Sequence, residues 1–306
     1  MRLGIDLGGT KTEIVALGEE GVEIYRKRVD TDTSSYEAIL LTIAGLVGEA
    51  ERAVGKTGSV GIGIPGTISS RTGCVKNANT NALNGHPLDR DLGNLLHREV
   101  RCMNDANCLA LSEAVDGAGA GYRIVFAAVL GTGCGAGISI EAAPWQGLNR
   151  VAGEWGHNPL PWMRKEETPG TQCWCGKSSC IETWISGTGF EKDYARTAPA
   201  GSVSLLNGQQ IVSLARSGDE PAGEALRRYA DRLARSLALV INVFDPEVIV
   251  LGGGMSNVDE LYELTPPLLS SYVFGGEAQT PIVRSRHGDS SGVRGAAWLW
   301  PRSEIR

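Results

Sequence analysis

One pattern occurs twice in this chain, and it constrains the fold more than any other feature. An apolar strand leads into a turn of glycine and threonine, and a second strand follows the turn. The first copy covers residues 3–17 and the second covers residues 124–140, with Gly8-Gly9-Thr10 and Gly131-Thr132-Gly133 at the turns. The same strand pair in both halves of a chain indicates two related domains. We therefore expect two α/β domains that face each other across a cleft.

The remaining elements follow from hydrophobic periodicity and from glycine and proline breaks. Strands are predicted at residues 2–7, 12–17, 22–28, 59–64, 99–103, 124–130, 136–140 and 247–251. Helices are predicted at residues 36–54, 106–115 and 222–244. A glycine-rich stretch at residues 117–121 is the expected hinge, which places one domain at residues 1–118 and the other at residues 119–291. Residues 292–306 are expected to form a helix that packs back on the first domain.

Composition excludes several classes of function. The 35 acidic residues outnumber the 29 lysines and arginines, so the net charge of −6 gives no basic field for nucleic acid or anionic lipid. A charge at Asp6 interrupts the N-terminal apolar stretch, and no apolar run approaches the ~20 residues that cross a bilayer. The seven cysteines are an odd number without an export signal, which indicates reduced thiols and a cytoplasmic protein.

The first glycine turn combines groups that suit phosphate binding. In Asp6-Leu7-Gly8-Gly9-Thr10-Lys11 the glycines allow backbone N–H groups to approach phosphate oxygens, and the last two side chains add donors and charge. Asp6 is suited to hold a hydrated Mg²⁺, which prefers one or two carboxylates together with substrate phosphates. The alternative is a tight hairpin with an exposed acid at its edge. The second turn and the glycine triplet at residues 252–254 favour a nucleotide that lies between the domains.

Three of the cysteines lie within eight positions of one another. Cys173, Cys175 and Cys180, with His157 upstream, supply three sulfurs and one imidazole, the ligand set of a tetrahedral zinc site. Four protein ligands leave no open position, so the zinc is expected to be structural and to order the loop at residues 157–180. The alternative is three unpaired thiols in a surface loop. The chain's seven tryptophans are mostly expected in the core or at interfaces.

These motifs together resemble one known family. The pairing of Asp6-x-Gly8-Gly9-Thr10-Lys11 with Gly131-Thr132-Gly133 resembles the ROK family of sugar kinases, within the actin-like ATPase superfamily. The resemblance covers nearly the whole chain and includes Gly63-Ile64-Pro65-Gly66, Asn104-Asp105-Ala106-Asn107, and residues 153–157, 173–180 and 251–254. It implies an actin-like (ribonuclease H-like) ATPase fold. It also implies a zinc loop of the pattern C-x-C-G-x-x-G-C, in which Ser179 replaces the second glycine here.

The resemblance also implies roles for individual residues. Asp105 follows a predicted strand, where a carboxylate can accept a proton from a sugar hydroxyl or cap the next helix, and the two roles are compatible. The family pattern makes Asp105 the base. The implied sugar site contains Gly66, Asn79, Asn104, Asp105, Glu154, His157 and Glu182. The implied nucleotide site contains Asp6, Gly8, Gly9, Thr10, Lys11, Gly131, Thr132, Gly133, Cys134, Gly135, Gly253 and Gly254.

The resemblance implies two roles for His157, and the two glutamates of the sugar site have an alternative interpretation. His157 would bind zinc through one ring nitrogen and direct the other toward the sugar, which links the zinc loop to substrate affinity. For Glu154 and Glu182 the alternative is that both are solvated surface charges.

The implied activity is phosphorylation of a hexose with ATP, Mg²⁺ and a structural Zn²⁺, in a protein that acts as a homodimer. The resemblance is strongest to bacterial fructokinases, also called manno(fructo)kinases, so the expected reaction makes fructose 6-phosphate, with mannose and glucose as secondary substrates. N-acetylhexosamine kinase and glucokinase are the alternatives within the family. A sugar-sensing transcriptional regulator is disfavoured, because only five residues precede Asp6 and the chain is acidic. An actin-like structural ATPase is disfavoured by the zinc ligands and the paired sugar carboxylates.

Overall fold

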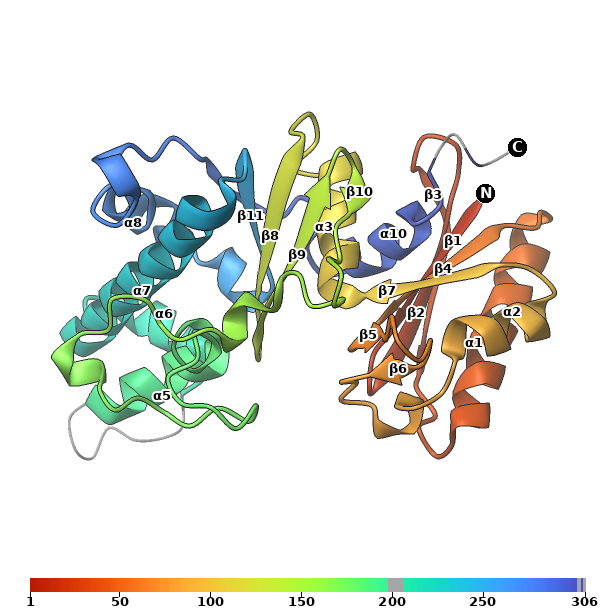
Figure 1. Ribbon diagram of the computed structural model, residues 1–306, viewed down its shortest axis with the longest axis horizontal. Coiled ribbons are helices and arrows are strands. Elements are labelled where there is room, and N and C mark those ends of the chain that lie inside the picture. Colours follow the sequence, from red (N-terminus) through yellow and green to blue (C-terminus); the bar gives the residue numbers. More distant parts are fainter. Residues whose placement is uncertain (198–205, 302–303, 305–306) are drawn as a thin grey trace. The chain divides into compact units, whose positions relative to one another are not determined.

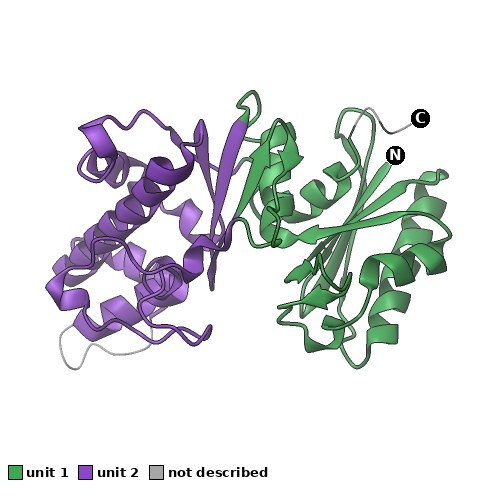
Figure 2. Ribbon diagram, viewed as in Figure 1, with its two compact units in different colours: residues 1–123, 137–152, 286–306 green, residues 124–136, 153–285 purple. Residues whose placement is uncertain are grey.

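The computed structural model describes residues 1–197, 206–301 and 304, and it divides into two compact units (Figure 2). Unit 1 comprises residues 1–123, 137–152 and 286–306, and unit 2 comprises residues 124–136 and 153–285. The predicted boundary placed residues 137–152 in the second domain. They group with unit 1 because this segment packs on α3 (Asp105–Val115), where Ile138 N donates to Asn107 Oδ1 at 3.4 Å.

Unit 1 is built on a five-stranded sheet in the order β3-β2-β1-β4-β7 (Figure 1). Its strands are β1 (Arg2–Leu7), β2 (Lys11–Leu17), β3 (Glu23–Asp30), β4 (Ser59–Ile64) and β7 (Val100–Asn104). The first three strands pair antiparallel, whereas β1, β4 and β7 are parallel to one another. The carboxyl ends of the parallel strands therefore meet at one edge of the sheet, which is where ligands bind in open α/β sheets.

Side-chain alternation along β2 explains why helices cover both faces of this sheet. Ile14 and Ala16 belong to a core with the helices α1 and α2, whereas Val15 and Leu17 belong to a second core with α3 and α10. The bounds of these helices are α1 (Tyr36–Val54), α2 (Leu88–Leu96) and α10 (Ser291–Trp298). The C-terminal helix thus packs on the first sheet.

The approach of α10 to the sheet requires glycine on the strand. A Cβ atom at Gly61 of β4 would lie 1.9 Å from the carbonyl oxygen of Ala296, a distance that no real side chain tolerates. The same holds at Gly295, where a Cβ atom would lie 1.7 Å from the carbonyl oxygen of Cys108 in α3. Glycine at these positions lets the backbone of α10 contact both the sheet and α3 directly.

Unit 2 contains most of the second sheet, whose order is β10-β9-β8-β11-β12. The strands are β8 (Ile124–Leu130), β9 (Cys134–Ile140), β10 (Ala143–Pro144), β11 (Val248–Gly252) and β12 (Ile282–Arg284). β11 runs parallel to both β8 and β12. The helices are α4 (Glu182–Ile185), α5 (Gly187–Thr197), α6 (Gly208–Arg216), α7 (Glu220–Phe244), α8 (Glu260–Leu264) and α9 (Pro266–Leu269).

The long helix α7 begins and ends where capping residues allow. The Asp219 side chain accepts a hydrogen bond from Ala222 N at 2.9 Å, which satisfies a donor of the first turn. Asp245 adopts a left-handed conformation and ends the helix. The predicted helix at residues 222–244 is therefore confirmed, with one additional half-turn at its start.

The shorter elements lie in the connections. They are β5 (Thr67–Ile68), β6 (Val75–Lys76), and the 3₁₀ turns η1 (Asn81–Leu83), η2 (Glu154–His157), η3 (Lys165–Glu167), η4 (Gly254–Asn257), η5 (Phe274–Gly276) and η6 (Gly288–Ser290). Among the residues that the structure describes, no helix has the length and apolar character needed to span a membrane.

Candidate active site

Asp6 lies near the carboxyl end of β1, at the sheet edge of unit 1. Burial raises the pKa of its carboxyl from 3.8 to about 6, and the negative charges of Asp105 and Glu13 act in the same direction. Gly292 of α10 lies next to this carboxylate, because a Cβ atom there would be in van der Waals contact with Asp6 Oδ2 at 3.5 Å. A nearby cation stabilises carboxylates that repel one another, so the oxygens of Asp6 fit the predicted Mg²⁺.

Asn104 and Asp105 form the junction between β7 and α3. Asn104 is the residue that caps the helix, because its Oδ1 accepts hydrogen bonds from Ala106 N at 3.0 Å and Asn107 N at 3.3 Å. Asp105 is exposed at the first helical position, where its Oδ1 accepts from Ala106 N at 2.7 Å. The alternative that Asp105 serves as the helix cap is thus wrong. Its carboxylate is exposed at the edge of the sheet where the parallel strands end.

Of the two other predicted sugar residues of unit 1, Gly66 contacts this junction directly. Asn104 Nδ2 donates to the carbonyl oxygen of Gly66 at 3.1 Å. Gly66 has φ +86°, and a Cβ atom there would lie 2.5 Å from the carbonyl oxygen of Lys76, so only glycine fits. Asn79 is exposed in the loop after β6, beside Thr80. Unit 1 therefore brings Gly66, Asn104 and Asp105 to the ends of its parallel strands.

The hairpin between β1 and β2 presents its glycine turn to solvent. Gly8 N donates to the carbonyl oxygen of Lys11 at 3.0 Å, and the carbonyl oxygen of Gly8 accepts from Thr31 Oγ1 at 2.9 Å. Gly9, Thr10 and Lys11 are exposed. The turn is therefore rigid in its backbone and open at its tip, as a phosphate-binding loop requires.

The second glycine turn lines a cavity of about 690 Å³ within unit 2. Gly131, Thr132 and Gly254 are the predicted nucleotide residues among its walls. The turn is held by α5, because Gly187 N donates to the carbonyl oxygen of Gly131 at 2.7 Å and Thr188 Oγ1 donates to that of Thr132 at 2.8 Å. The volume of the cavity falls in the range of about 300–1,000 Å³ typical of small-molecule sites.

Sequence reasoning missed most residues of this cavity. The walls include Gly187, Thr188, Glu191, Asn207, Gly208, Gln209, Val212, Arg216, Met255, Asn257 and Val258. One signal was available: residues 187–189 read Gly-Thr-Gly, a repeat of the turn sequence at residues 131–133, at the start of α5. Backbone N–H groups at a helix start are suited to anions, so that repeat pointed to the same site.

The other predicted nucleotide residues lie next to the cavity or behind it. Gly133 lines a neighbouring cavity of about 470 Å³. Gly253 has φ +78° and packs on the backbone of Leu130. Cys134 is buried, and the carbonyl oxygen of Gly135 accepts from Trp155 Nε1 at 2.9 Å. Gly253, Cys134 and Gly135 support the turn from within unit 2, and like Gly133 they do not line the larger cavity.

The predicted zinc ligands come together. The ligand atoms of His157, Cys173, Cys175 and Cys180 all lie within 4.8 Å of one another. Cys175 Sγ and Cys180 Sγ are 3.6 Å apart, and Cys173 Sγ lies 3.7 Å from His157 Nδ1. Zn–S bonds of about 2.3 Å in a tetrahedron place two sulfurs about 3.8 Å apart, so the residues fit zinc. Nδ1 is the ring nitrogen that faces the metal position.

Ser179 stands where the family's zinc-loop pattern has its second glycine, and its backbone conformation shows how serine fits there. It adopts φ +61°, the left-handed conformation that glycine normally supplies, and its Oγ donates to the carbonyl oxygen of Pro169 at 2.9 Å. In the same loop, Cys173 N donates to the carbonyl oxygen of Lys177 at 2.7 Å, which closes a tight turn around Cys175. The turn therefore forms with serine, because the side-chain hydrogen bond offsets part of the cost of the left-handed backbone conformation.

The three predicted sugar ligands of unit 2 differ in their surroundings. Glu154 is exposed, and it begins the same 3₁₀ turn that His157 ends. Glu182 is the first residue of α4, and its Oε2 accepts from Cys134 N at 2.9 Å. Its Oε1 accepts from Trp174 Nε1 at 2.7 Å. The carboxylate of Glu182 is thus held in position and is not a freely solvated charge.

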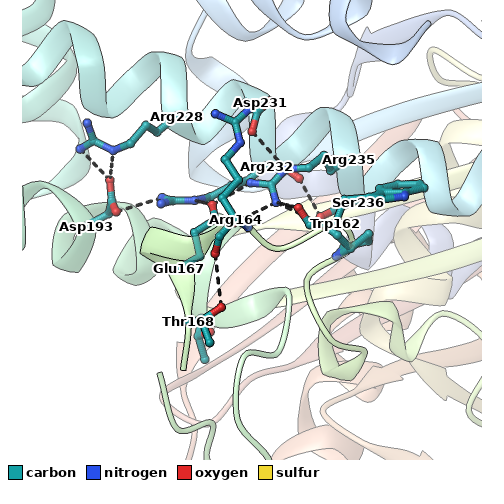
Figure 3. A network of polar contacts seen from close by, with 12 residues as sticks. Trp162, Arg164, Glu167, Thr168, Asp193, Arg228, Asp231, Arg232, Arg235 and Ser236 are labelled. Atoms are coloured by element: carbon teal, nitrogen blue, oxygen red, sulfur yellow. Dashed lines mark hydrogen bonds and ion pairs between the residues drawn. The ribbon is translucent and has the colours of Figure 1, made fainter. Parts of the chain in front are cut away.

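The same loop is held at a second place by buried ion pairs (Figure 3). Glu167 Oε1 accepts from Arg232 Nε at 2.8 Å and from Arg235 Nη2 at 2.7 Å. Arg232 Nη1 also lies 3.0 Å from Asp193 Oδ1 of α5. All four side chains are at most 4% exposed. Burial alone would raise the pKa of Glu167, but the hydrogen bonds from the two arginines outweigh it and lower the pKa to about 2.

Comparison with known proteins identifies the family. The model of the ROK family matches residues 2–303. An N-acetyl-D-glucosamine kinase of Pectobacterium carotovorum subsp. carotovorum (strain PC1) is 42% identical over 303 residues, covering 98% of each chain. The protein of the same name from Haemophilus influenzae (strain 86-028NP) is 39% identical over 305 residues, covering 98% of this chain and 99% of that protein. The crystal structure of a ROK hexokinase from Thermus thermophilus is similar with a TM-score of 0.84 and 29% identity, covering 97% of each chain.

The chain therefore belongs to the ROK family, and its fold is the actin-like (ribonuclease H-like) ATPase fold that the sequence predicted. Within that family it is a sugar kinase. The expectation that bacterial fructokinases are its nearest relatives finds no support here. The similar proteins carry the name of N-acetyl-D-glucosamine, which was the alternative substrate class.

Proposed function

We propose that the protein is an ATP-dependent N-acetylglucosamine kinase that phosphorylates the 6-hydroxyl group of its sugar. One observation carries the choice of sugar: proteins named N-acetyl-D-glucosamine kinase are 38% to 42% identical to this chain over 98% of its length. The structure supports the kinase reaction through the exposed carboxylate of Asp105 and the cavity beside Gly131. Fructose is the substrate that the sequence resemblance favoured, and it becomes the competing prediction.

In the proposed reaction Asp105 is the general base. Its carboxylate accepts the proton of the 6-hydroxyl while the sugar oxygen forms a bond to the γ-phosphorus, and ADP leaves with the electrons of the broken P–O bond. Asn104 holds Asp105 at the first position of α3, because it caps that helix and bonds Gly66. A carboxylate fixed in this way needs little reorganisation when the proton moves.

The proposed sugar contacts come from side chains whose geometry suits hydroxyl groups. Glu182 has both oxygens engaged by N–H donors, yet a carboxylate has about four lone-pair positions and can accept sugar hydroxyls as well. His157 Nδ1 faces the zinc ligands, which leaves Nε2 for the sugar. Glu154 lies one 3₁₀ turn before His157, so the two side chains project from the same side of η2.

ATP is proposed to occupy the cavity of about 690 Å³ in unit 2, with its phosphates at Gly131 and Thr132 and at the start of α5. Gly8, Gly9, Thr10 and Lys11 are the proposed phosphate contacts of unit 1. Mg²⁺, when bound, neutralises charge on the transferred phosphoryl group, and Asp6 is the proposed residue that holds it. Zinc at the cluster of three cysteines and His157 is proposed to be structural.

The test is kcat/KM for five sugars, measured by coupled detection of ADP: N-acetylglucosamine, N-acetylmannosamine, glucose, mannose and fructose. We expect N-acetylglucosamine to give the highest value. A higher value for fructose would replace the proposed substrate with the one that the sequence resemblance favoured. Absence of ADP release with every sugar would contradict the kinase reaction itself.

The role of Asp105 is tested by Asp105→Asn, which keeps the size of the side chain and removes its basicity. We expect kcat to fall by about 10²- to 10⁴-fold, the usual contribution of a general base. Sugar binding measured by calorimetry should remain near that of the wild type, since Asn104 still caps the helix. A kcat close to the wild-type value would contradict the assignment.

A further inference from the structure

Trp174 has an unusual combination of exposure and order. It lies between the zinc ligands Cys173 and Cys175, and 77% of its surface is exposed. Most of this large apolar side chain therefore stabilises no core of unit 2. A single exposed apolar side chain is common on protein surfaces, so a role for Trp174 has to be argued from its contacts.

Two contacts of the indole ring and the loop backbone nevertheless hold the side chain in position. Its Nε1 donates to Glu182 Oε1 at 2.7 Å. Its ring meets the His157 ring edge to face, with centroids 4.9 Å apart and planes at 85°. Its backbone belongs to a short loop whose two flanking residues face the same metal position. The ring is thus fixed before any ligand arrives, so little conformational entropy is lost when one binds.

The partners of Trp174 connect it to the sugar. Glu182 and His157 are both proposed sugar ligands, and Trp174 contacts each of them. The ring also lines the cavity of about 470 Å³, together with Gly133 and Lys192. A sugar group bound by the carboxylate and the imidazole would lie within reach of the exposed indole face.

We propose that Trp174 determines specificity by packing its indole ring against the methyl group of the sugar's acetamido substituent. This inference rests on the proposed N-acetylglucosamine kinase activity. A carboxylate and an imidazole suit the hydroxyl groups that all hexoses share, whereas a methyl group needs apolar surface. Within this loop the exposed ring of Trp174 supplies that surface, and plain hexoses have no acetamido methyl group with which to use it.

The test compares Trp174→Ala with the wild type on N-acetylglucosamine and glucose. Loss of the apolar contact made by one methyl or methylene group of a substrate changes kcat/KM by about 10- to 200-fold. We expect a decrease in that range for N-acetylglucosamine, mainly through a higher KM, and a much smaller decrease for glucose. A uniform binding contact affects KM more than kcat.

Trp174→Phe and Trp162→Ala serve as matched variants. Phe keeps an aromatic face and loses the N–H group, so we expect most of the preference for the acetylated sugar to remain. Trp162 lies in the same loop, is 51% exposed and packs against the ring of Tyr272, so its removal should leave the ratio of the two sugars unchanged. The Phe variant also tests the inference if the Ala variant fails to fold.

Zinc content and the wild-type panel separate the possible outcomes. An equal loss for both sugars in Trp174→Ala, or loss of zinc from that variant, would overturn the proposal, since Trp174 would then only support the loop. Wild-type turnover of N-acetylglucosamine tests the proposed function in the same assay. Failure there overturns both, whereas an active wild type with an unchanged sugar ratio in the variants overturns the role of Trp174 alone.

Discussion

The loop at residues 157–180 is held at two places of contrasting chemistry. At one place three sulfur atoms and one imidazole nitrogen lie within 4.8 Å of one another, an arrangement that fits a metal ion. At the other place Glu167 is bound by two arginines of α7, and no further group is needed. The first is visible in the sequence as a spacing of cysteines, whereas the second joins residues 65 or more positions apart. Two independent attachments explain how a loop with little core of its own stays ordered beside the proposed sugar site.

The largest effect is expected where the metal is removed. Cys175→Ser removes one sulfur ligand, so we expect loss of bound zinc and a decrease of more than about 4 kcal/mol in the free energy of unfolding, as for other lost metals. Zinc content by elemental analysis and urea unfolding check this. Cys74→Ser, a partly exposed cysteine of unit 1, is the control. Full zinc and unchanged stability in Cys175→Ser would contradict a structural metal.

A smaller but substantial effect is expected at the ion network. Glu167→Gln leaves Arg232 and Arg235 buried without their shared carboxylate, and breaking a buried pair in this way costs about 3–5 kcal/mol. Urea unfolding measures the loss, and Glu166→Gln, at the exposed neighbouring position, is the matched control. Zinc content should stay near that of the wild type. A loss no larger than in the control would show that the network contributes nothing to stability.

The pKa of Glu167 predicts how acid affects this second attachment. Its pKa falls from 4.5 in the unfolded chain to about 2 in the folded protein, so its contribution is present above pH 4.5 and is lost as the pH falls toward 2. The shift corresponds to about 3 kcal/mol. The stability difference between wild type and Glu167→Gln should therefore shrink between pH 4.5 and 2. A difference that stays constant over this range would refute the assignment.

The smallest effect is expected at Ser179. Ser179→Gly removes the hydrogen bond to Pro169, which contributes about 0.5–1.5 kcal/mol, but it relieves a left-handed backbone conformation. These terms oppose each other, so the net change in unfolding free energy should be below about 1 kcal/mol. Ser179→Val, which has neither advantage, should be clearly less stable. Loss of zinc in the glycine variant would contradict this account.

Some of the site could be predicted from the sequence because its signals are local. The zinc ligands were recognised from the spacing of three cysteines, and the structure brings them together with His157. The glycine turns were recognised because they follow apolar strands. The fold class followed from the repeated strand pair and from the resemblance to the ROK family, and both are confirmed.

Other features depend on contacts that sequence patterns do not show. Position alone could not decide whether Asn104 or Asp105 caps α3, because both are good capping residues. The cavity walls at Asn207 and Met255 come from separate segments that only the fold brings together. The choice of sugar was also beyond the sequence pattern, since the residues proposed to bind hydroxyl groups, such as Glu182, would suit many hexoses alike.

The position of α10 has a consequence for biosynthesis. Val293, Ala296 and Trp298 complete the core that contains Val15 and Leu17, which lie far earlier in the chain. A ribosome synthesises the chain from its N-terminus, so the part of this sheet face that α10 covers stays exposed while about 270 further residues are added, even after α3 has been made. The unit that begins first therefore finishes last, and a nascent chain that stops before α10 exposes an apolar sheet face to chaperones and proteases.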